Sequence, residues 1–347
     1  MTKTLAALIA AHPDDAQALG APDRAWLNYS GLRSLAADVA QTLHRAGIGR
    51  GDRVAIVLPN GPEMATAFLT VAQVATTAPL NPGYKEDEYA FYLDDLKAKA
   101  LIVLEGDDGP AIKAAAKLEI AILRLSFDAS GPAGAFILSG DTGLKDNDKT
   151  APAEGDVALI LHTSGTTSRP KIVPLTQANL YASALNIRTS LALTSSDRCL
   201  SIMPLFHIHG LIAALSATMA AGGEISCAPG FNALKFFGQI KDVDPTWYTA
   251  VPTMHQAILA RSARNKDIID AARLRFLRSS SASLPAPVME ELVATFGAPV
   301  IEAYGMTEAT HQMCSNPLPP KVQKPGSVGL AAGPEVRIAS ETDNTLL

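Results

Sequence analysis

Apolar residues follow two rhythms along this chain, one typical of buried strands and one typical of helices. Runs of consecutive apolar residues, such as 53–58 and 157–161, predict strands that are buried on both faces. Between such runs, apolar residues recur three and four positions apart, as at Met64, Phe68 and Val71, which predicts helices. This alternation predicts an α/β fold of layered parallel sheets flanked by helices.

The expected elements cover most of the chain. Strands are expected at 53–58, 101–104, 120–125, 157–161, 199–203, 224–228, 247–251, 274–278 and 300–302. Helices are expected at 86–96, 111–117, 177–193, 211–221, 233–243, 253–262 and 287–296, with two more that start near Ser30, as an N-cap, and near Pro62. The stretch 128–155 is poor in large apolar residues and is expected to be a surface connection.

The composition narrows the class of protein only a little. The chain has 347 residues, 48% apolar and 18% charged, with a net charge of −5, which is ordinary for a globular protein and gives no electrostatic reason to expect nucleic acid or an anionic membrane as a partner. The apolar stretch 211–221 is too short to cross a bilayer, and the first residues make a poor signal peptide. Cys199, Cys227 and Cys314 are widely spaced and form no metal-binding pattern, which fits a reducing compartment, so a cytoplasmic protein is expected. The sequence does not indicate the oligomeric state.

One loop is dense in hydroxyl groups and follows the strand expected at 157–161. It runs through Thr163, Ser164, Gly165, Thr166, Thr167 and Ser168 to Arg169, Pro170 and Lys171. Small residues let the backbone approach a ligand closely, and the hydroxyls, N–H groups and cations suit a polyphosphate. It is not a Walker-type loop, because Pro170 replaces the second glycine and Ile172 replaces the hydroxyl residue that would hold Mg²⁺. An ordinary solvated Ser/Thr/Gly loop is the alternative.

A second group of reactive side chains follows the strand expected at 300–302. Tyr304, Gly305, Met306, Thr307 and Glu308 bring an aromatic ring, a hydroxyl and a carboxylate into five positions. Tyr304 can stack on a base, Thr307 can bond a phosphate, and Glu308 can bind Mg²⁺ through oxygen. A Tyr-Gly turn with a solvated glutamate is the alternative.

Two more segments lie at the ends of expected strands, where α/β sheets bind ligands. Ser281, Ala282 and Ser283 form a small-residue turn, which by itself could equally be a plain turn before a helix. His207 and His209 follow the strand expected at 199–203. We expect His209 to be packed in the core, and the alternative is that it supports the residues of the acid site from behind.

Taken together, these segments resemble the adenylate-forming superfamily, which includes acyl-CoA synthetases, luciferases and peptide-synthetase adenylation domains. The loop resembles the pattern T-S-G-T-T-G-x-P-K-G, with departures at Ser168 and Ile172, and residues 304–308 match Y-G-x-T-E. The segment around His207 resembles P-x-F-H-x-x-G, and residues 281–283 resemble the adenine-binding segment. The resemblance implies an enzyme that uses ATP, Mg²⁺ and CoA to activate a carboxylic acid.

The resemblance also assigns expected roles to single residues. The nucleotide-binding residues would be Thr163, Ser164, Gly165, Thr166, Thr167, Ser168, Lys171, Ser281, Ala282, Ser283, Tyr304, Gly305, Met306 and Thr307. The catalytic residues would be Lys171, His207, Thr307 and Glu308, with Glu308 as the metal ligand.

His207, Ser281 and His311 are expected to bind the acid, because two imidazoles and a hydroxyl suit the second carboxylate of a very small acid. At these positions and at 79–82 the chain is similar to the oxalate-activating branch, so oxalate is the expected acid. Two alternatives stay open: a ligase for another short acid such as malonate, and a catalytically silent nucleotide-binding module. An amino-acid-activating domain would need an acidic residue for the substrate amine, and these positions offer none.

The resemblance finally implies how the chain is divided. Residues 1–65 and 195–320 are expected to form one α/β unit, residues 66–194 a second unit with the phosphate loop, and residues 325–347 the start of a small β-barrel, with a strand at 335–338. Superfamily members continue with an acidic ribose-binding residue, a hinge and a mobile C-terminal domain with a catalytic lysine. Those elements are not found here, so a truncated AMP-binding domain with almost no activity of its own is expected.

Overall fold

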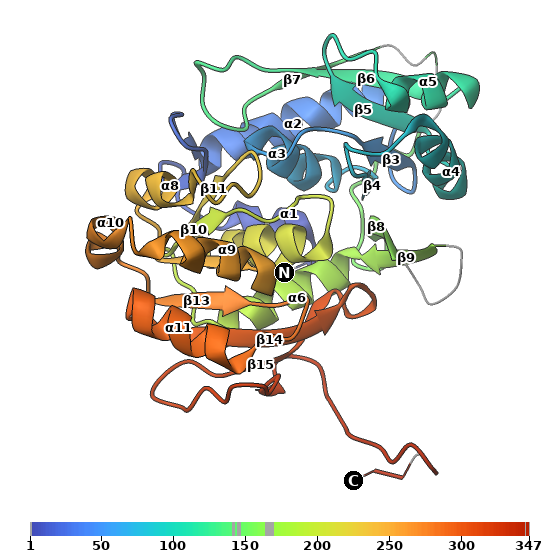
Figure 1. Ribbon diagram of the computed structural model, residues 1–347. Coiled ribbons are helices and arrows are strands. Elements are labelled where there is room, and N and C mark those ends of the chain that lie inside the picture. Colours follow the sequence, from blue (N-terminus) through green and yellow to red (C-terminus); the bar gives the residue numbers. More distant parts are fainter. Residues whose placement is uncertain (1, 141–142, 144–146, 164–169, 344, 347) are drawn as a thin grey trace.

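The computed structural model of the chain describes residues 2–140, 143, 147–163, 170–343 and 345–346. Within these residues the strands form one sheet of seven and one sheet of nine strands (Figure 1). In Figure 1 the seven-stranded sheet lies above the nine-stranded sheet, and helices lie between and outside them. The expected α/β layers are confirmed.

The seven-stranded sheet is built from the middle of the chain. Its order is β7 (Ile137–Ser139), β6 (Ala121–Ser126), β5 (Ala100–Leu104), β3 (Arg53–Ile56), β4 (Thr76–Pro79), β8 (Val157–Thr163) and β9 (Lys171–Thr176). Neighbouring strands from β6 to β8 are parallel, and the edge strands β7 and β9 are antiparallel to β6 and β8. The carboxyl ends of the parallel strands therefore share one edge.

The nine-stranded sheet combines the start of the chain with its second half. Its order is β16 (Leu330–Ala331), β15 (His311–Ser315), β14 (Val300–Met306), β13 (Phe276–Ser279), β12 (Trp247–Ala250), β10 (Arg198–Ser201), β11 (Glu224–Cys227), β1 (Gln17–Gly20) and β2 (Leu27–Asn28). In this sheet the neighbouring strands from β14 across to β1 are parallel. The strands β2, β15 and β16 at its two ends are antiparallel to their neighbours.

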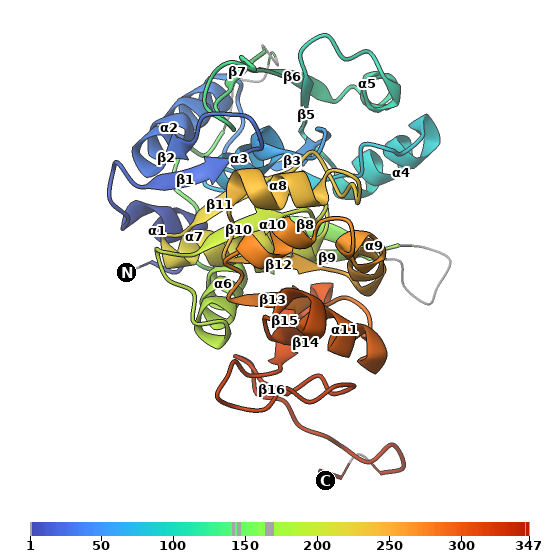
Figure 2. The ribbon, with the colours of Figure 1, turned by 60° about the vertical axis from the view of Figure 1, so that its left-hand side comes forward.

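Helices fill three layers around the two sheets, as the rotated view in Figure 2 also shows. The central layer holds α1 (Leu5–Ala10), α2 (Tyr29–Arg45), α3 (Pro62–Val71), α6 (Gln177–Ser190), the π-helix η1 (His209–Ser216) and α7 (Ala217–Ala221). The helices α4 (Glu86–Leu96) and α5 (Pro110–Lys117) cover the outer face of the seven-stranded sheet. The helices α8 (Phe236–Val243), α9 (Pro252–Ser262), α10 (Lys266–Ala271) and α11 (Ala286–Phe296) cover the outer face of the nine-stranded sheet.

The alternation of side chains along each parallel strand explains why both faces are covered. In β5, Ile102 packs in the central cluster while Leu101 and Val103 pack under α4 and α5. In β13, Phe276 faces the central cluster and Leu277 faces the outer helices. Successive side chains point to opposite faces of a sheet, so a continuous apolar run needs a helix layer on each side.

Several expectations need correction. The helix α2 begins at Tyr29 and its cap is Asn28, whose side-chain oxygen accepts a hydrogen bond from the N–H of Gly31, so Ser30 is not the N-cap. The expected unit boundary at residue 65 falls inside α3, which packs between the two sheets, and β3 before it pairs with β4 and β5 of the seven-stranded sheet. The stretch 128–155 contains the edge strand β7.

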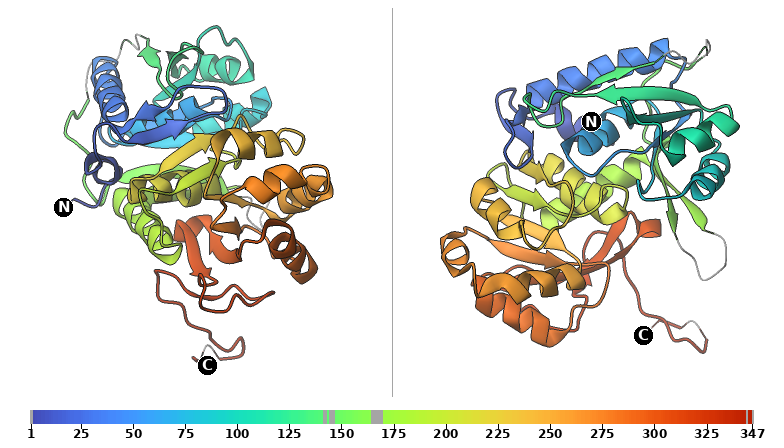
Figure 3. Two further views of the ribbon diagram at one scale, coloured as in Figure 1. Left: turned by 90° about the vertical axis from the view of Figure 1, so that its left-hand side faces the viewer. Right: turned by 45° about the horizontal axis from the view of Figure 1, so that its top comes forward.

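The segment after β16 also differs from expectation. Residues 335–338 do not form the strand expected at the entry to a barrel; Val336 and Ile338 are exposed, and the described residues place no strand beside them. This red segment leaves the body in every view (Figures 1 to 3). Among the described helices, none is long and apolar enough to span a bilayer.

Candidate active site

The two expected nucleotide signatures meet at the carboxyl edge of the sheets. Thr163 ends β8 and Lys171 begins β9, and these two residues are direct partners in the antiparallel register. The loop between them therefore starts and ends at one place. Ser164, Gly165, Thr166, Thr167 and Ser168, which were expected to bind phosphate, lie outside the described residues.

Glu308 reaches the base of this loop from the other sheet. It lies in the 3₁₀ turn η2 (Thr307–Ala309), and its Oε1 accepts a long hydrogen bond of 3.5 Å from the hydroxyl of Thr163, 145 positions away in sequence. Its side chain is otherwise exposed. The fold thus brings Thr163, at the base of the hydroxyl-rich loop, together with the Tyr304–Glu308 segment.

Glu308 offers a single carboxylate, so a cation bound there would need further oxygen ligands from water or from a bound substrate. In the described part of the chain, no group of three His, Cys, Asp or Glu side chains could hold a metal ion. Mg²⁺ is commonly bound by one or two carboxylates, water and the phosphates of a substrate. One exposed carboxylate beside a hydroxyl fits that manner of binding, and Glu308 with Thr163 would hold the ion.

A cavity of about 340 Å³ lies beside this meeting point, and we call it the histidine cavity. Its polar lining comes from four histidines, a serine and a threonine: His162, His207, His209, His311, Ser281 and Thr307. Leu161, Met203, Phe206, Ile208, Val251, Gly305 and Met306 complete it. His207, Ser281 and His311, which were expected to bind the acid, therefore line one cavity. They are far apart in sequence: His207 follows β10, Ser281 follows β13 and His311 begins β15.

The backbone around the histidine cavity is strained. Ser281, Thr310 and His311 have backbone φ values of 74°, 55° and 88°, a region that residues other than glycine rarely adopt. Such conformations cost on the order of 1–3 kcal/mol each and persist where the surrounding structure imposes them. Here the hydroxyl of Ser183 in α6 donates to the carbonyl of Thr310 at 2.6 Å. A Cβ at Gly305 would lie 1.6 Å from the carbonyl oxygen of His311. Only glycine therefore allows the neighbouring strands β14 and β15 to approach each other so closely at this point.

A buried polar network stands behind the cavity. His209 is 2% exposed; its Nδ1 lies 3.0 Å from the hydroxyl of Ser281 and its Nε2 lies 2.6 Å from the hydroxyl of Thr249. His311 is also 2% exposed, and its ring stacks on that of His209 with centroids 5.0 Å apart. Burial lowers the pKa of both imidazoles well below the usual value, so both are neutral at pH 7. His209 is thus buried as expected, but it also forms part of the lining of the histidine cavity.

Arg278 supplies the charge of this network. Its side chain is fully buried, and its guanidinium lies 3.2 Å from Nε2 of His311, 3.4 Å from Nε2 of His209 and 3.3 Å from Oε1 of Gln312. Burial lowers the pKa of Arg278 to about 9, so it remains protonated at neutral pH. The position was missed because the run 274–278 was interpreted only as a strand. An arginine within a strand covered on both faces is itself the signal, since such a charge is rarely buried without a function.

A second cavity of about 290 Å³ adjoins the first, and we call it the tyrosine cavity. It is lined by Ser281, Ala282, Ser283, Glu302, Ala303, Tyr304, Gly305, Gly326 and Val328, and it shares Ser281 and Gly305 with the histidine cavity. The side chain of Tyr304 is 46% exposed and free to stack on a flat ring.

Glu302 is a second residue that sequence reasoning missed. It is 3% exposed; its Oε1 accepts from the N–H of Leu284 at 3.0 Å, and its Oε2 is buried without a partner in the described structure. A buried acceptor beside an exposed aromatic ring suits a flat ligand with an N–H group.

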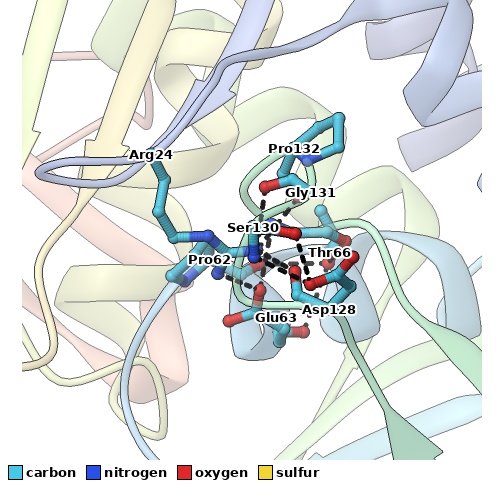
Figure 4. A network of polar contacts seen from close by, with 9 residues as sticks. Arg24, Pro62, Glu63, Thr66, Asp128, Ser130, Gly131 and Pro132 are labelled. Atoms are coloured by element: carbon cyan, nitrogen blue, oxygen red, sulfur yellow. Dashed lines mark hydrogen bonds and ion pairs between the residues drawn. The ribbon is translucent and has the colours of Figure 1, made fainter.

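A larger cavity of about 570 Å³ lies elsewhere along the same edge, between the loops after β1, β3 and β11 and the helix α8. The nearby network ties the two sheets together (Figure 4): Arg24 forms an ion pair of 2.5 Å with Glu63, and also bonds the carbonyl of Pro132. None of the described residues of the two signatures lines this cavity, so the two smaller cavities are the candidates for the site.

Comparisons with known proteins agree with the motifs. The family model of AMP-binding enzymes matches residues 5–346. The oxalate–CoA ligase of Arabidopsis thaliana is 43% identical over 333 residues, which is 94% of this chain and 65% of that protein. The oxalate–CoA ligase of Saccharomyces cerevisiae is 41% identical over 320 residues, 86% of this chain and 58% of that protein.

Among solved structures, ATP-bound MatB from Rhodopseudomonas palustris superimposes with a TM-score of 0.85 at 28% identity, covering 100% of this chain and 68% of that chain. The chain spans about 60% of the length of the curated relatives that it matches. The motifs, the layered fold and these matches show that the chain belongs to the AMP-binding enzyme family, in the superfamily of adenylate-forming acyl-CoA ligases.

Proposed function

We propose that this chain is the nucleotide-binding part of an acid–thiol ligase that activates a small dicarboxylic acid, oxalate, with ATP and passes it to CoA. The observation that carries the proposal is the pair of joined cavities. One cavity offers an aromatic face and a buried acceptor, and the other offers imidazole and hydroxyl groups. Such a pair suits an adenylate with a very short, polar acyl group.

The tyrosine cavity is proposed to hold adenine. Tyr304 would stack on the ring, Ser281, Ala282 and Ser283 would border it, and the unpartnered oxygen of Glu302 would accept a bond from the exocyclic amine. The base of the loop at Thr163 and Lys171 would face the phosphates, with Thr307 nearest the α-phosphate.

In the proposed reaction an oxygen of the bound carboxylate attacks the α-phosphorus of ATP. A new O–P bond forms while the bond to the bridging oxygen of pyrophosphate breaks, which gives an acyl-adenylate. The CoA thiol then attacks the acyl carbon, the C–S bond forms, the bond to AMP breaks, and the thiol proton is released. This chain's residues would orient the acid and exclude water from it. Mg²⁺, when held by Glu308, supplies positive charge for the phosphates.

The choice of oxalate rests on the size and polarity of the histidine cavity. Its volume of about 340 Å³ lies at the small end of the range of roughly 300–1,000 Å³ usual for ligand sites, and it must also admit the reacting phosphate. His311, His207 and Ser281 would bind the second carboxylate. The relatives named oxalate–CoA ligases support the same choice.

Pyrophosphate exchange tests the proposal. The complete protein is supplied with ATP, labelled pyrophosphate and one acid at a time: oxalate, malonate, succinate or acetate. Exchange that is strongest with oxalate supports the proposal. Exchange that is strongest with malonate would show that the enzyme is a ligase for malonate rather than for oxalate. Nucleotide binding without exchange for any of these acids would indicate a catalytically silent nucleotide-binding module.

A further inference from the structure

We propose that Arg278 makes the histidine cavity specific for a dianion, by holding His311 and His209 in the tautomers that direct hydrogen-bond donors at the second carboxylate. The inference rests on the proposed function and assigns a positioning residue to it. Arg278 would not touch the acid; it would act through the two imidazoles and Ser281.

The environment of Arg278 contains acceptors and no counter-charge. Its guanidinium bonds two imidazoles, the hydroxyl of Thr249 and the amide oxygen of Gln312, and in the described structure no carboxylate pairs with it. Its Nε has no hydrogen-bond partner among the residues that the structure describes. A buried charge without a counter-charge is costly to the fold, and an anion bound next to the network would offset that cost.

The protons of His311 follow from counting donors. A guanidinium only donates, so Nε2 of His311, 3.2 Å from Nη2 of Arg278, must accept. A neutral imidazole that accepts at Nε2 carries its proton on Nδ1. No residue of the described chain bonds Nδ1 of His311, so this N–H is available to a ligand in the cavity that His311 lines.

The same count gives the orientation of Ser281. Nε2 of His209 lies within reach of Arg278 and of the hydroxyl of Thr249, which itself lies 3.4 Å from the guanidinium. Nε2 therefore accepts, and Nδ1–H donates to the oxygen of Ser281 at 3.0 Å. The hydroxyl of Ser281 then has its own proton free for the cavity. One buried cation thus produces two donors at the cavity wall.

This arrangement predicts which acids bind. A dicarboxylate as short as oxalate can occupy both donors and place its second charge near the cation. A monocarboxylic acid with an apolar end would leave the two donors unsatisfied in a closed site, which is a strong basis for rejection. Gln312 keeps the guanidinium in place, because its amide nitrogen is held by Ser190 at 2.8 Å and by the carbonyl of Ala332 at 3.2 Å.

The first test measures the tautomers in the unaltered chain. The chain labelled with ¹⁵N-histidine is examined by NMR at neutral pH without ligand, and the variants His209→Gln and His311→Gln serve only to assign its resonances. Both imidazoles should be neutral and protonated at Nδ1. A resonance pattern with the proton on Nε2 of His311 would overturn the inference whatever the protein's substrate is.

The second test uses Arg278→Gln, Arg278→Lys and the control Arg275→Gln, whose residue lies just before the same strand, pairs with Asp197 and does not line the cavity. Calorimetry with oxalate should show affinity weakened about thirtyfold or more in Arg278→Gln, a smaller loss in Arg278→Lys, and an unchanged value in Arg275→Gln. The affinity for ATP should be unchanged in all three. Equal losses for oxalate and ATP would mean that Arg278 is merely structural.

If Arg278→Gln does not fold, the lysine variant and the tautomers of the unaltered chain still decide the matter. The proposed function fails in a different way. An unaltered chain that binds ATP but neither oxalate nor another dicarboxylate would refute that function, while the tautomer measurement would still report on Arg278.

Discussion

Replacing Ser281 by alanine gives the sharpest test of how the acid is bound. The hydroxyl of Ser281 lies 3.0 Å from Nδ1 of His209, from which we infer that it accepts a hydrogen bond, and it lies at the point shared by the two cavities. Because its backbone φ of 74° is equally unfavourable for serine and alanine, the substitution leaves the strain unchanged and removes only the hydroxyl.

The expected size of the effect follows from the bonds that are lost. A hydrogen bond to a charged group contributes roughly 1.5–3 kcal/mol, so KM for oxalate should rise about 10- to 150-fold. Nδ1 of His209 also loses its buried acceptor, which should lower the free energy of unfolding by about 1–3 kcal/mol. KM for ATP should barely change, since Tyr304 and Glu302 are untouched.

Ser283→Ala is the matched control, because Ser283 belongs to the same turn but lines only the tyrosine cavity. Pyrophosphate exchange is measured in the complete protein with oxalate and ATP varied in turn, and urea denaturation gives the stability. The reasoning is refuted if Ser281→Ala raises both KM values equally, or if Ser283→Ala weakens oxalate as much as Ser281→Ala does.

Three further predictions concern the metal anchor, the contact between the sheets and the buried histidines. Glu308→Gln should lower acyl-adenylate formation about a hundredfold or more in pyrophosphate exchange, because it removes the charge proposed to hold Mg²⁺. Arg24→Met should lower the free energy of unfolding in urea by about 3 kcal/mol, because the largely buried carboxylate of Glu63 loses its partner. Burial lowers the pKa of His255 to about 4, against about 6.5 when unfolded, so its contribution to stability is complete above pH 6.5 and is lost as the pH falls toward 4. Urea denaturation should show that His255→Gln removes about 2 kcal/mol of the stability difference between pH 7 and pH 5.

Each of these three has an outcome that contradicts it. Near-normal turnover of Glu308→Gln at saturating Mg²⁺ would place the ion elsewhere. Arg273→Met breaks an exposed ion pair with Asp244 and should leave the free energy of unfolding almost unchanged; an Arg24→Met variant that is no less stable than Arg273→Met would show that burial of the Arg24–Glu63 pair is unimportant. A gap between the unaltered chain and His255→Gln that does not vary with pH would show that His255 titrates normally in the folded chain.

The periodic pattern of the chain was sufficient to predict the layers. The strands β5, β10, β11 and β12 and the helices α4, α9 and α11 lie within two residues of the expected bounds. These elements carry apolar runs or helical spacings long enough to show their period. The strands β1, β2, β4 and β16 were missed, because none of them contains a run of large apolar residues; β4, for example, consists of two threonines, an alanine and a proline.

The motifs predicted which segments would meet but not how they are connected. The contact between Thr163 and Glu308 joins two sheets, and no local pattern specifies it. His209 was expected to be a packed core histidine, because the sequence shows its apolar neighbours but not the polar side chains that it meets in the fold. Its partners Ser281 and Thr249 come from other strands. The role proposed for Arg278 likewise depends on contacts that only the fold creates.

The least favourable features of the chain lie together at one edge of the nine-stranded sheet. Ser281, Thr310 and His311 carry strained backbone, Arg278 carries a buried charge, and Glu302 has a buried oxygen that finds no partner among the described residues. Each would cost on the order of 1–3 kcal/mol, and the apolar clusters on either side of the sheet must offset them in the free protein. A ligand that fills both cavities would satisfy Glu302, the donors and the charge together. Such a ligand should raise the melting temperature more than AMP or oxalate alone does at the same free ligand concentration L, because stabilisation grows as RT ln(1 + L/Kd) and the ligand that makes all of these contacts should have the lowest Kd.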